Sequence, residues 1–252
     1  MSGFWHLVFY KPLYNVLVWL VTNLPFHSMF FAIVILTIVV RIILYPFSYK
    51  SLKTQIQMSR VKGKLKEIQE KYEDKQEQAR KTMELYREHK INPFSSFLTI
   101  LVQLPLIIAL YKVFRDFATK GFDSTLLYHF VNAPETITLH QFGIDLTGKS
   151  IALAILVGVS QYFYLHISSK MRKEVEKKAG VENIKKSSHE KMIESLGSSM
   201  KYTMPFFVGF ISYIAGSALS LYWFVSNLFL LGQEIVIHKR VERGELAKEN
   251  TA

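Results

Sequence analysis

Cysteine is absent from the 252 residues of this chain. The absence excludes a disulfide framework, a thiol nucleophile and a cysteine-linked lipid anchor. Neither a Walker A pattern nor a GxGxxG pattern occurs, so no nucleotide site is indicated. The eight histidines are far apart and form no pair with metal-ligand spacing. The sequence therefore predicts no cofactor, no metal site and no enzyme activity.

Intramembrane proteolysis is one chemistry that the remaining residue types leave open. Ser160 follows Gly158-Val159 within an apolar run, as a nucleophilic serine would. His166 and His238, however, lie toward the ends of their runs, too far along to meet Ser160. Ser160 is better interpreted as a small packing residue.

Acidic residues are missing from the depth of five apolar runs. The runs are Ile33–Pro46, Phe94–Tyr111, Ile151–Ile167, Tyr202–Ala218 and Leu219–Ile237. A membrane-spanning helix needs about 20 mostly apolar residues. We therefore expect an all-α integral membrane protein with five transmembrane helices, joined by two long charged segments.

Basic residues alternate between the connecting segments. Segment 48–92 holds twelve Lys and Arg, 169–201 holds nine and 239–252 holds four, whereas 1–27 holds one and 115–149 holds three. Because cytoplasmic loops carry the excess of Lys and Arg, the N-terminus is expected outside and the C-terminus in the cytoplasm. Seven and five acidic residues are interleaved in the first two segments, which argues against a nucleic-acid-binding arm.

These patterns divide the chain into nine segments. They are an outer interfacial amphipathic helix (1–27), transmembrane helix one (28–47), a cytoplasmic helical hairpin (48–92), transmembrane helix two (93–114), an outer loop (115–149), transmembrane helix three (150–168), a cytoplasmic loop (169–201), transmembrane helices four and five (202–238) and a cytoplasmic tail (239–252).

The first segment has an alternative as a sixth span. Lys11-Pro12 interrupts it, and no early positive region or cleavage site indicates a signal peptide. Trp5, Tyr10 and Trp19 are typical of interfacial anchors, which favours a helix lying in the outer interface.

Two apolar stripes define the hairpin. Val61, Leu65, Ile68 and Tyr72 follow helical steps of 4, 3 and 4, and Ala79, Met83, Tyr86 and Lys90 repeat them after a polar break. Neither stripe is wide enough for a globular core, so we expect a mobile hairpin or one held by the membrane or a partner. In span four, Gly209, Ser212, Ala215, Gly216 and Ala218 predict close helix packing.

Arg41 is a permanent charge inside the first apolar run. It precedes Lys50 by nine residues, which on a straight helix is about 13 Å. Each of the other runs also contributes polar side chains at a similar depth, namely Thr99, Gln103, Gln161, Ser212, Ser226 and Asn227. Intramembrane charges usually face a hydrated cavity. One shared polar cavity is therefore predicted, with snorkelling of Arg41 and ordinary interhelical hydrogen bonds as the alternative.

Four stretches carry a family resemblance. TIVVRIILYPFSYKSLKTQIQMSRVKGKLKEIQEKYED resembles the first span and following helix of the YidC-type membrane protein insertases, and INPFSSFLTILVQLPLIIALYKVF their second span. FGIDLTGKS is similar to the segment before their third span, and LYWFVSNLFLLGQEIVIHKR to the fifth. The likeness as a whole runs, in the same order, over about residues 5–240.

The resemblance implies five spans around a hydrophilic groove open to the cytoplasm and to lipid. It implies that Arg41 is the functional centre, that Gln161 and Trp223 line the groove, and that 50–90 form a mobile lid facing substrate or ribosome. Implied partners are nascent membrane proteins, the lipid bilayer, the ribosome and the Sec translocon, in a bacterial plasma membrane. Gly216-Ser217-Ala218 departs from the family's Pro-Ala-Gly run, and no large outer domain is present, as in the minimal bacterial form.

Three functions remain in competition at this point. The favoured function is an insertase and chaperone that receives hydrophobic client segments from the cytoplasm and releases them into lipid. A small-solute transporter or channel is the alternative, although no inverted repeat is evident. The third is a scaffold whose hairpin docks a partner.

Overall fold

The computed structural model describes residues 3–178, 180 and 188–242, without the side chains of 96–100, 102, 188–198, 241 and 242. The chain divides into two compact units. We call Met1–Ile43, Val102–Tyr164 and Lys201–Leu230 the first unit, and Leu44–Leu101, Leu165–Met200 and Leu231–Ala252 the second unit.

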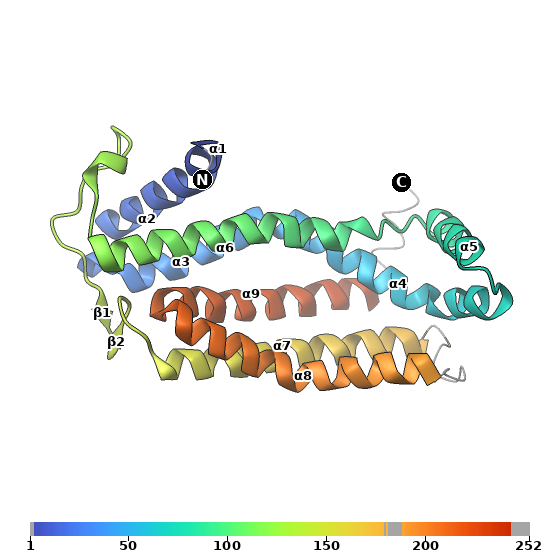
Figure 1. The fold of residues 1–252 in the computed structure, drawn as a ribbon. Helices are drawn as coiled ribbons and strands as arrows, with labels where there is room; N and C mark the ends of the chain where they lie inside the picture. Colours follow the sequence, from blue (N-terminus) through green and yellow to red (C-terminus); the bar gives the residue numbers. More distant parts are fainter. Residues whose placement is uncertain (1–2, 179, 181–187, 243–252) are drawn as a thin grey trace. The chain divides into compact units, whose positions relative to one another are not determined.

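Helices dominate both units (Figure 1). The α-helices are α1 (Gly3–Trp5), α2 (Lys11–Asn23), α3 (Met29–Ile43), α4 (Tyr45–Lys71), α5 (Lys75–Glu88), α6 (Phe94–Lys120), α7 (Ile151–Lys178), α8 (Ser188–Ala215) and α9 (Ser217–Glu242). A π-helical segment, η1 (His6–Tyr10), joins α1 to α2, and two 3₁₀ turns are η2 (Pro25–His27) and η3 (Ser124–Leu126). Strands β1 (His140–Gln141) and β2 (Ile144–Asp145) form a small antiparallel hairpin.

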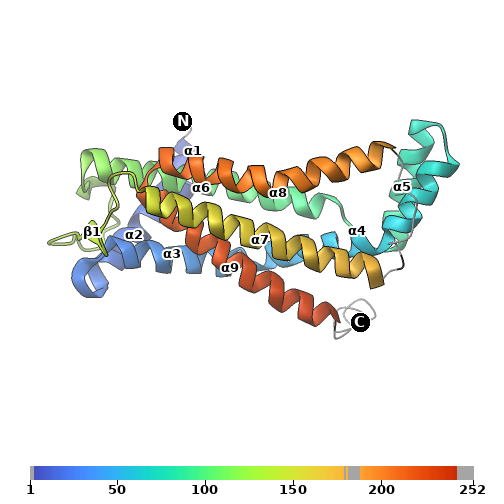
Figure 2. The same cartoon turned by 90° about the horizontal axis from the view of Figure 1, so that it is seen from below.

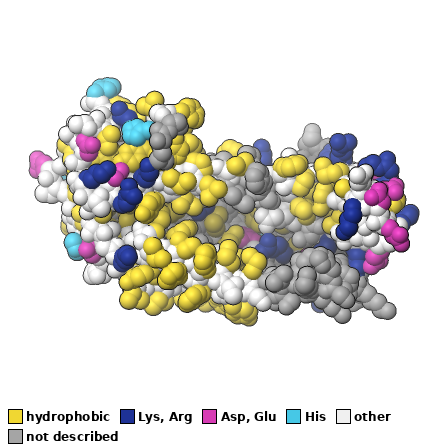
Figure 3. Space-filling model, viewed as in Figure 1, with side chains coloured by type: hydrophobic (Ala, Val, Ile, Leu, Met, Phe, Trp, Pro, Cys, Tyr) yellow, Lys and Arg dark blue, Asp and Glu magenta, His cyan; other side chains and the backbone are white. Residues whose placement is uncertain are grey.

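Two described helices, α7 and α9, are long and apolar enough to cross a membrane. A third candidate arises if α3 and α4 count as one span with a break. The described residues therefore support a helical membrane protein, with fewer candidate spans than the five expected. On the face drawn in Figure 3, hydrophobic side chains cover much of the helical surface. Exposed examples on α8 are Phe206, Phe207 and Phe210, as expected for a surface in lipid.

The first predicted span, 28–47, is interrupted at Leu44. Pro46 is the second residue of α4 and has no N–H to donate to the carbonyl of Ile42. Its ring also crowds that carbonyl, so α3 ends at Ile43. The straight-helix depth for Arg41, counted through this break to Lys50, therefore does not apply.

The N-terminal helices of the first unit pack against the end of α6. Tyr14 stacks on Phe117 with ring centroids 5.0 Å apart, and the Tyr10 hydroxyl donates to Asp116 Oδ2 at 2.8 Å. Tyr10 is 6% exposed, so its expected role as an interfacial anchor is wrong: its hydroxyl is used inside the protein. Trp19, by contrast, is 50% exposed.

Helices α7 and α8 approach closely at two glycines, and they lie side by side in Figures 1 and 2. A Cβ on Gly209 would lie 3.0 Å from the carbonyl oxygen of Ala154, and one on Gly158 would lie 3.2 Å from that of Pro205. Only glycine, which has no Cβ, fits at these two positions without moving the helices apart. This confirms the predicted close packing of span four at Gly209.

The turn between α8 and α9 consists of Gly216 alone. Its φ of +102° lies in a region that residues with a Cβ rarely adopt. The N–H and the hydroxyl of Ser217 both donate to the carbonyl of Gly148, at 2.9 and 3.1 Å. The turn therefore falls two residues before the expected boundary at 218, because the glycine supplies the required backbone geometry.

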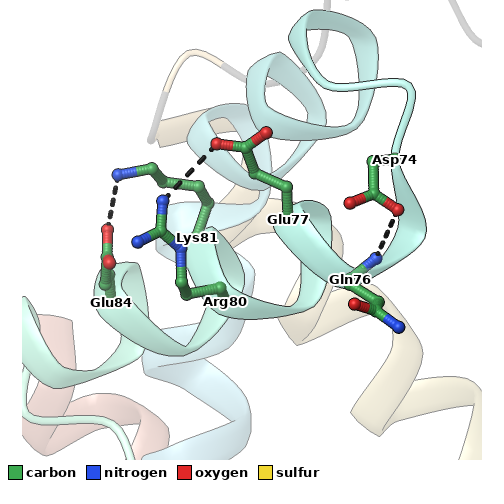
Figure 4. A network of polar contacts seen from close by, with 6 residues as sticks. All are labelled: Asp74, Gln76, Glu77, Arg80, Lys81 and Glu84. Atoms are coloured by element: carbon green, nitrogen blue, oxygen red, sulfur yellow. Dashed lines mark hydrogen bonds and ion pairs between the residues drawn. The ribbon is translucent and has the colours of Figure 1, made fainter.

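In the second unit, α4 and α5 form a helical hairpin around a non-helical break at residues 72–74. Asp74 caps α5 by accepting from the N–H of Gln76 at 3.1 Å. Figure 4 shows this cap with two ion pairs along α5, Arg80 with Glu77 and Lys81 with Glu84. The Lys81 ammonium holds the pKa of the exposed Glu84 below its usual value.

The hairpin has a small core of its own, contrary to the expectation from its narrow stripes. Val61, Leu85, Tyr86 and Ile91 are buried together, with Met58, Leu65 and Ile68 packed around them. A second cluster joins Ile56 of α4 to Val175 of α7 and Ile237 of α9. The narrow stripes are enough to form buried clusters, because α5 covers α4 at one end and α7 and α9 cover it at the other.

We predict that Gly209→Ala lowers the free energy of unfolding by about 1–3 kcal/mol, because α7 and α8 must separate to admit the methyl group. Gly232→Ala is the matched control: no atom lies within 4 Å of the place its methyl group would take, and alanine is the better helix former, by about 0.5–1 kcal/mol. Thermal unfolding of both variants in detergent measures the effect. Equal stability of the two variants would contradict the close packing.

Candidate functional site

Arg41 lies in the last turn of α3 and is only 6% exposed. Among the described residues no carboxylate pairs with it, and its Nε has no hydrogen-bond partner. The last turn of a helix, where carbonyl dipoles point outward, favours a cation. Arg41 is therefore a buried charge compensated by dipoles rather than by an acid of the described chain.

Two tyrosines lie within electrostatic range of the Arg41 guanidinium, Tyr164 on α7 and Tyr222 on α9. Tyr222 is 1% exposed, and its hydroxyl accepts from Gln103 Nε2 of α6 at 2.9 Å. We call Arg41, Gln103, Tyr164 and Tyr222 the Arg41 cluster. All four belong to the first unit, so residues from four helices converge there.

A second polar contact in this unit joins α9 to α7. Asn227 Nδ2 donates to Ser160 Oγ at 3.1 Å, and Ser160 in turn donates to the carbonyl of Val157. Ser226, one turn after Tyr222, is fully buried, and its hydroxyl has no partner among the described residues. Because Tyr222 and Ser226 share one face of α9, that face is polar over more than a turn.

The remaining predicted residues are not all in this arrangement. Ser212 is fully buried and donates to the carbonyl of its own helix at Gly209, at 2.8 Å. Gln161 and Trp223 are half-buried, and neither hydrogen-bonds to a described residue. The side chain of Thr99 lies outside the described residues.

Sequence reasoning missed Tyr164, Tyr222 and the bridging role of Ser160. A signal for one helix face did exist, since Ser220, Asn227 and Glu234 recur every seven residues along α9. A seven-residue spacing returns a side chain to nearly the same face of a helix. A tyrosine in an apolar run gives no comparable signal, because its ring packs in a hydrophobic core as readily as in a polar site.

The second unit contains a buried acid, Glu234. It is 4% exposed and hydrogen-bonds to Ser168, with Arg172 and His238 within electrostatic range. One of its carboxylate oxygens has no partner among the described residues. At 4% exposure, the carboxylate is shielded from solvent by the surrounding protein.

The Arg41 cluster contains donors and no nucleophile–base pair. Guanidinium, amide and phenol groups can bind carboxylates or backbone carbonyls, but they provide no covalent chemistry in this arrangement. Burying a charge away from water is costly unless a partner compensates it. A group that supplies an acceptor to Arg41 would recover part of that cost, so the cluster is suited to transient binding of a polar group.

The chain is similar in sequence to known membrane proteins over most of its length. The family model described as "60Kd inner membrane protein" matches residues 20–244. A protein of Oceanobacillus iheyensis named membrane protein insertase YidC is 29% identical over 94% of this chain and 85% of its own length. Homologues with the same name in Staphylococcus aureus and Wolinella succinogenes are 31% and 32% identical, over 74% and 38% of their own lengths.

The family match spans α3 to α9 and includes Arg41, Gln103, Gln161 and Tyr222. On this evidence, the chain belongs to the 60Kd inner membrane protein family, whose relatives above carry the name membrane protein insertase YidC.

Proposed function

We propose that the protein is a membrane protein insertase and chaperone. The observation that carries the proposal is Arg41, a buried cation without a carboxylate partner among the described residues. The names of the relatives support the same function, and nothing in the comparisons supports the solute-transporter alternative. No covalent step is required, since insertion moves a segment from water to lipid.

The proposed architecture is five transmembrane helices around a hydrophilic groove. The spans would be formed by α3, α6, α7, α8 and α9, with the N-terminus outside and the C-terminus in the cytoplasm of a bacterial plasma membrane. Polar residues of the Arg41 cluster, with Gln161, Ser226 and Asn227, would line the groove. Trp223 and Thr99 complete the proposed lining, while Ser212 contributes through packing.

The mechanism rests on partial solvation. A client segment that must cross the bilayer carries polar or acidic groups, whose transfer into hydrocarbon is costly. Arg41 would attract an acidic group, and the amide and hydroxyl groups would replace part of its lost hydration. The apolar part of the client then moves sideways into lipid, where burial of its side chains is favourable by about 25 cal/mol per Å².

The hairpin of α4 and α5 is proposed as a cytoplasmic lid. It carries mixed charge, as in the Glu77–Arg80 and Lys81–Glu84 pairs, and the small core described above lets it move as one body. Ribosome and Sec translocon are proposed partners of this surface, whereas clients and bilayer follow from insertion itself. A mixed-charge surface suits reversible contacts, because exposed ion pairs contribute little energy.

We predict that Arg41→Glu reduces insertion of a client with an acidic translocated tail by about ten-fold or more. Repulsion replaces attraction at the cluster, and about 1.4 kcal/mol suffices for that factor. Arg41→Lys should retain part of the activity, because the charge remains. Arg115→Glu is the matched control, since Arg115 is an exposed arginine of α6 outside the cluster.

Protease protection of the client tail in reconstituted vesicles measures the outcome. Normal insertion by Arg41→Glu would remove the basis of the mechanism. Solute flux without any added client would instead favour a transporter. Loss of all function on deletion of 50–90, with Arg41 dispensable, would favour a scaffold.

The hairpin can be tested separately at its contact with α7. Lys62 Nζ of α4 lies 3.0 Å from Glu176 Oε1 of α7. In the cysteine-free background, Lys62→Cys with Glu176→Cys can be joined by a short bis-maleimide. We predict that the cross-linked protein inserts clients at least several-fold more slowly, because the lid is fixed to α7. Without the cross-linker, the same double-cysteine variant should have near-normal activity.

The matched control is Lys81→Cys with Glu84→Cys, which places the same linkage within α5 (Figure 4). This linkage leaves the hairpin free to move as a body, so activity should be unaffected. Unchanged insertion with the Lys62–Glu176 positions joined would show that the lid does not need to leave α7.

A further inference from the structure

The first unit contains a cavity of about 310 Å³ remote from the Arg41 cluster along α6. Its lining residues come from the N-terminal helices and from the end of α6 with the segment that follows: Trp5, His6, Tyr10, Tyr14, Lys112, Asp116, Lys120, Gly121, Asp123 and Leu126. We call it the outer pocket. Its volume is at the lower end of small-ligand pockets, which are typically about 300–1,000 Å³.

One wall of the outer pocket is aromatic. His6 and Tyr10 stack with ring centroids 4.9 Å apart, and Tyr10 and Tyr14 with centroids 6.2 Å apart. The Trp5 ring centroid lies 6.3 Å from that of Tyr10, so Trp5 extends this row of aromatic rings. This wall can pack against the apolar part of a ligand and offers ring edges to its polar part.

The other part of the lining is a charged stripe on α6. Lys112, Asp116 and Lys120 recur every four residues and therefore share one face of the helix. Lys120 Nζ lies 3.0 Å from Asp116 Oδ1, and Lys112 Nζ lies 5.3 Å from the centre of the Trp5 ring. The lysines thus bracket the pocket with two ammonium groups.

Asp116 is already engaged by protein donors. Burial acts to raise its pKa, but the hydrogen bonds from Lys120 and Tyr10 outweigh burial and hold the pKa below its usual value. The carboxylate therefore stays ionised at neutral pH, and it competes with any incoming anion for Lys120. Removing its charge should strengthen the attraction of the pocket for an anion.

The surroundings of the outer pocket indicate where a ligand comes from. In the proposed orientation, Lys112 is near the end of the span 93–114 and would lie at headgroup height on the outer side. Phe4, Leu7 and Val8, which flank the aromatic wall in sequence, are 72%, 63% and 46% exposed. Apolar side chains exposed beside Trp and Lys are typical of a helix at the membrane interface, where acyl chains and phosphates are both in reach.

We propose that the outer pocket binds the headgroup phosphate of an outer-leaflet phospholipid. Lys112 and Lys120 would bind the phosphate oxygens, and the aromatic row would pack against the glycerol portion. The cavity is large enough for a headgroup and too small for a whole lipid, whose chains would lie along the exposed apolar side chains. The inference depends on the proposed membrane orientation and not on insertase activity.

The test is a titration of the purified full-length protein in detergent with short-chain phosphatidylglycerol, read by native mass spectrometry. We expect one tightly bound lipid, and binding about ten-fold weaker in the Lys112→Gln/Lys120→Gln variant, because charge-assisted hydrogen bonds to phosphate are lost. Lys149→Gln is the matched control: Lys149 also lies over an aromatic ring, that of Tyr213, but does not line the pocket.

A second variant guards against simple loss of structure. Asp116→Asn removes the competing charge and should tighten phosphatidylglycerol binding, with circular dichroism as the check on folding. Weaker binding by folded Asp116→Asn, or equal binding by the double-lysine and Lys149 variants, would overturn the proposal. Glycerol 3-phosphate that competes as well as the lipid would also overturn it, since the site would then serve a soluble phosphate ester. Because lipid binding is measured directly, the result stands whether or not the insertase proposal survives.

Discussion

The buried guanidinium of Arg41 is the constraint on which the rest of the site depends. Proline at position 46 ends α3 at Ile43 and thereby places Arg41 in a last helical turn, where outward-pointing carbonyls favour a cation. A fully paired ion would satisfy the charge and leave nothing to bind a client. Compensation by helix dipoles is weaker than a paired carboxylate. It keeps the cation inside the protein and leaves the guanidinium able to bind a carboxylate of a client.

Local signals in the sequence predicted the mostly helical character of the chain. Apolar runs and proline positions act over a few residues, so the helices and the break at residues 72–74 could be anticipated from spacing alone. Arg41 was evident because a permanent charge in an apolar run has few explanations. The exact end of α3 was missed, because Pro46 was placed at the end of a helix when it is the start of the next one.

Contacts between distant segments could not be predicted in the same way. The Gln103–Tyr222 hydrogen bond joins residues 119 positions apart, and its formation depends on how α6 and α9 are rotated about their axes. Tyr10 shows the same limit, since an interfacial tyrosine and one bonded to an acid within the protein look identical in sequence. Rotation and pairing are decided by the packing of whole helices, such as the glycine contact of α7 with α8, and not by local pattern.

Polar groups within the first unit differ in how fully they are satisfied, and this difference separates packing from binding. Ser160, Ser212 and Asn227 have partners: the two serines donate to carbonyls of their own helices, and Asn227 joins α9 to Ser160 of α7. Arg41 Nε and the hydroxyl of Ser226 have none among the described residues, although both are buried. Burial of an unsatisfied group costs about 1–3 kcal/mol, so a chain selected for stability alone would replace it. Retaining such groups on α3 and α9 is consistent with a surface whose partners arrive from outside the chain and leave again.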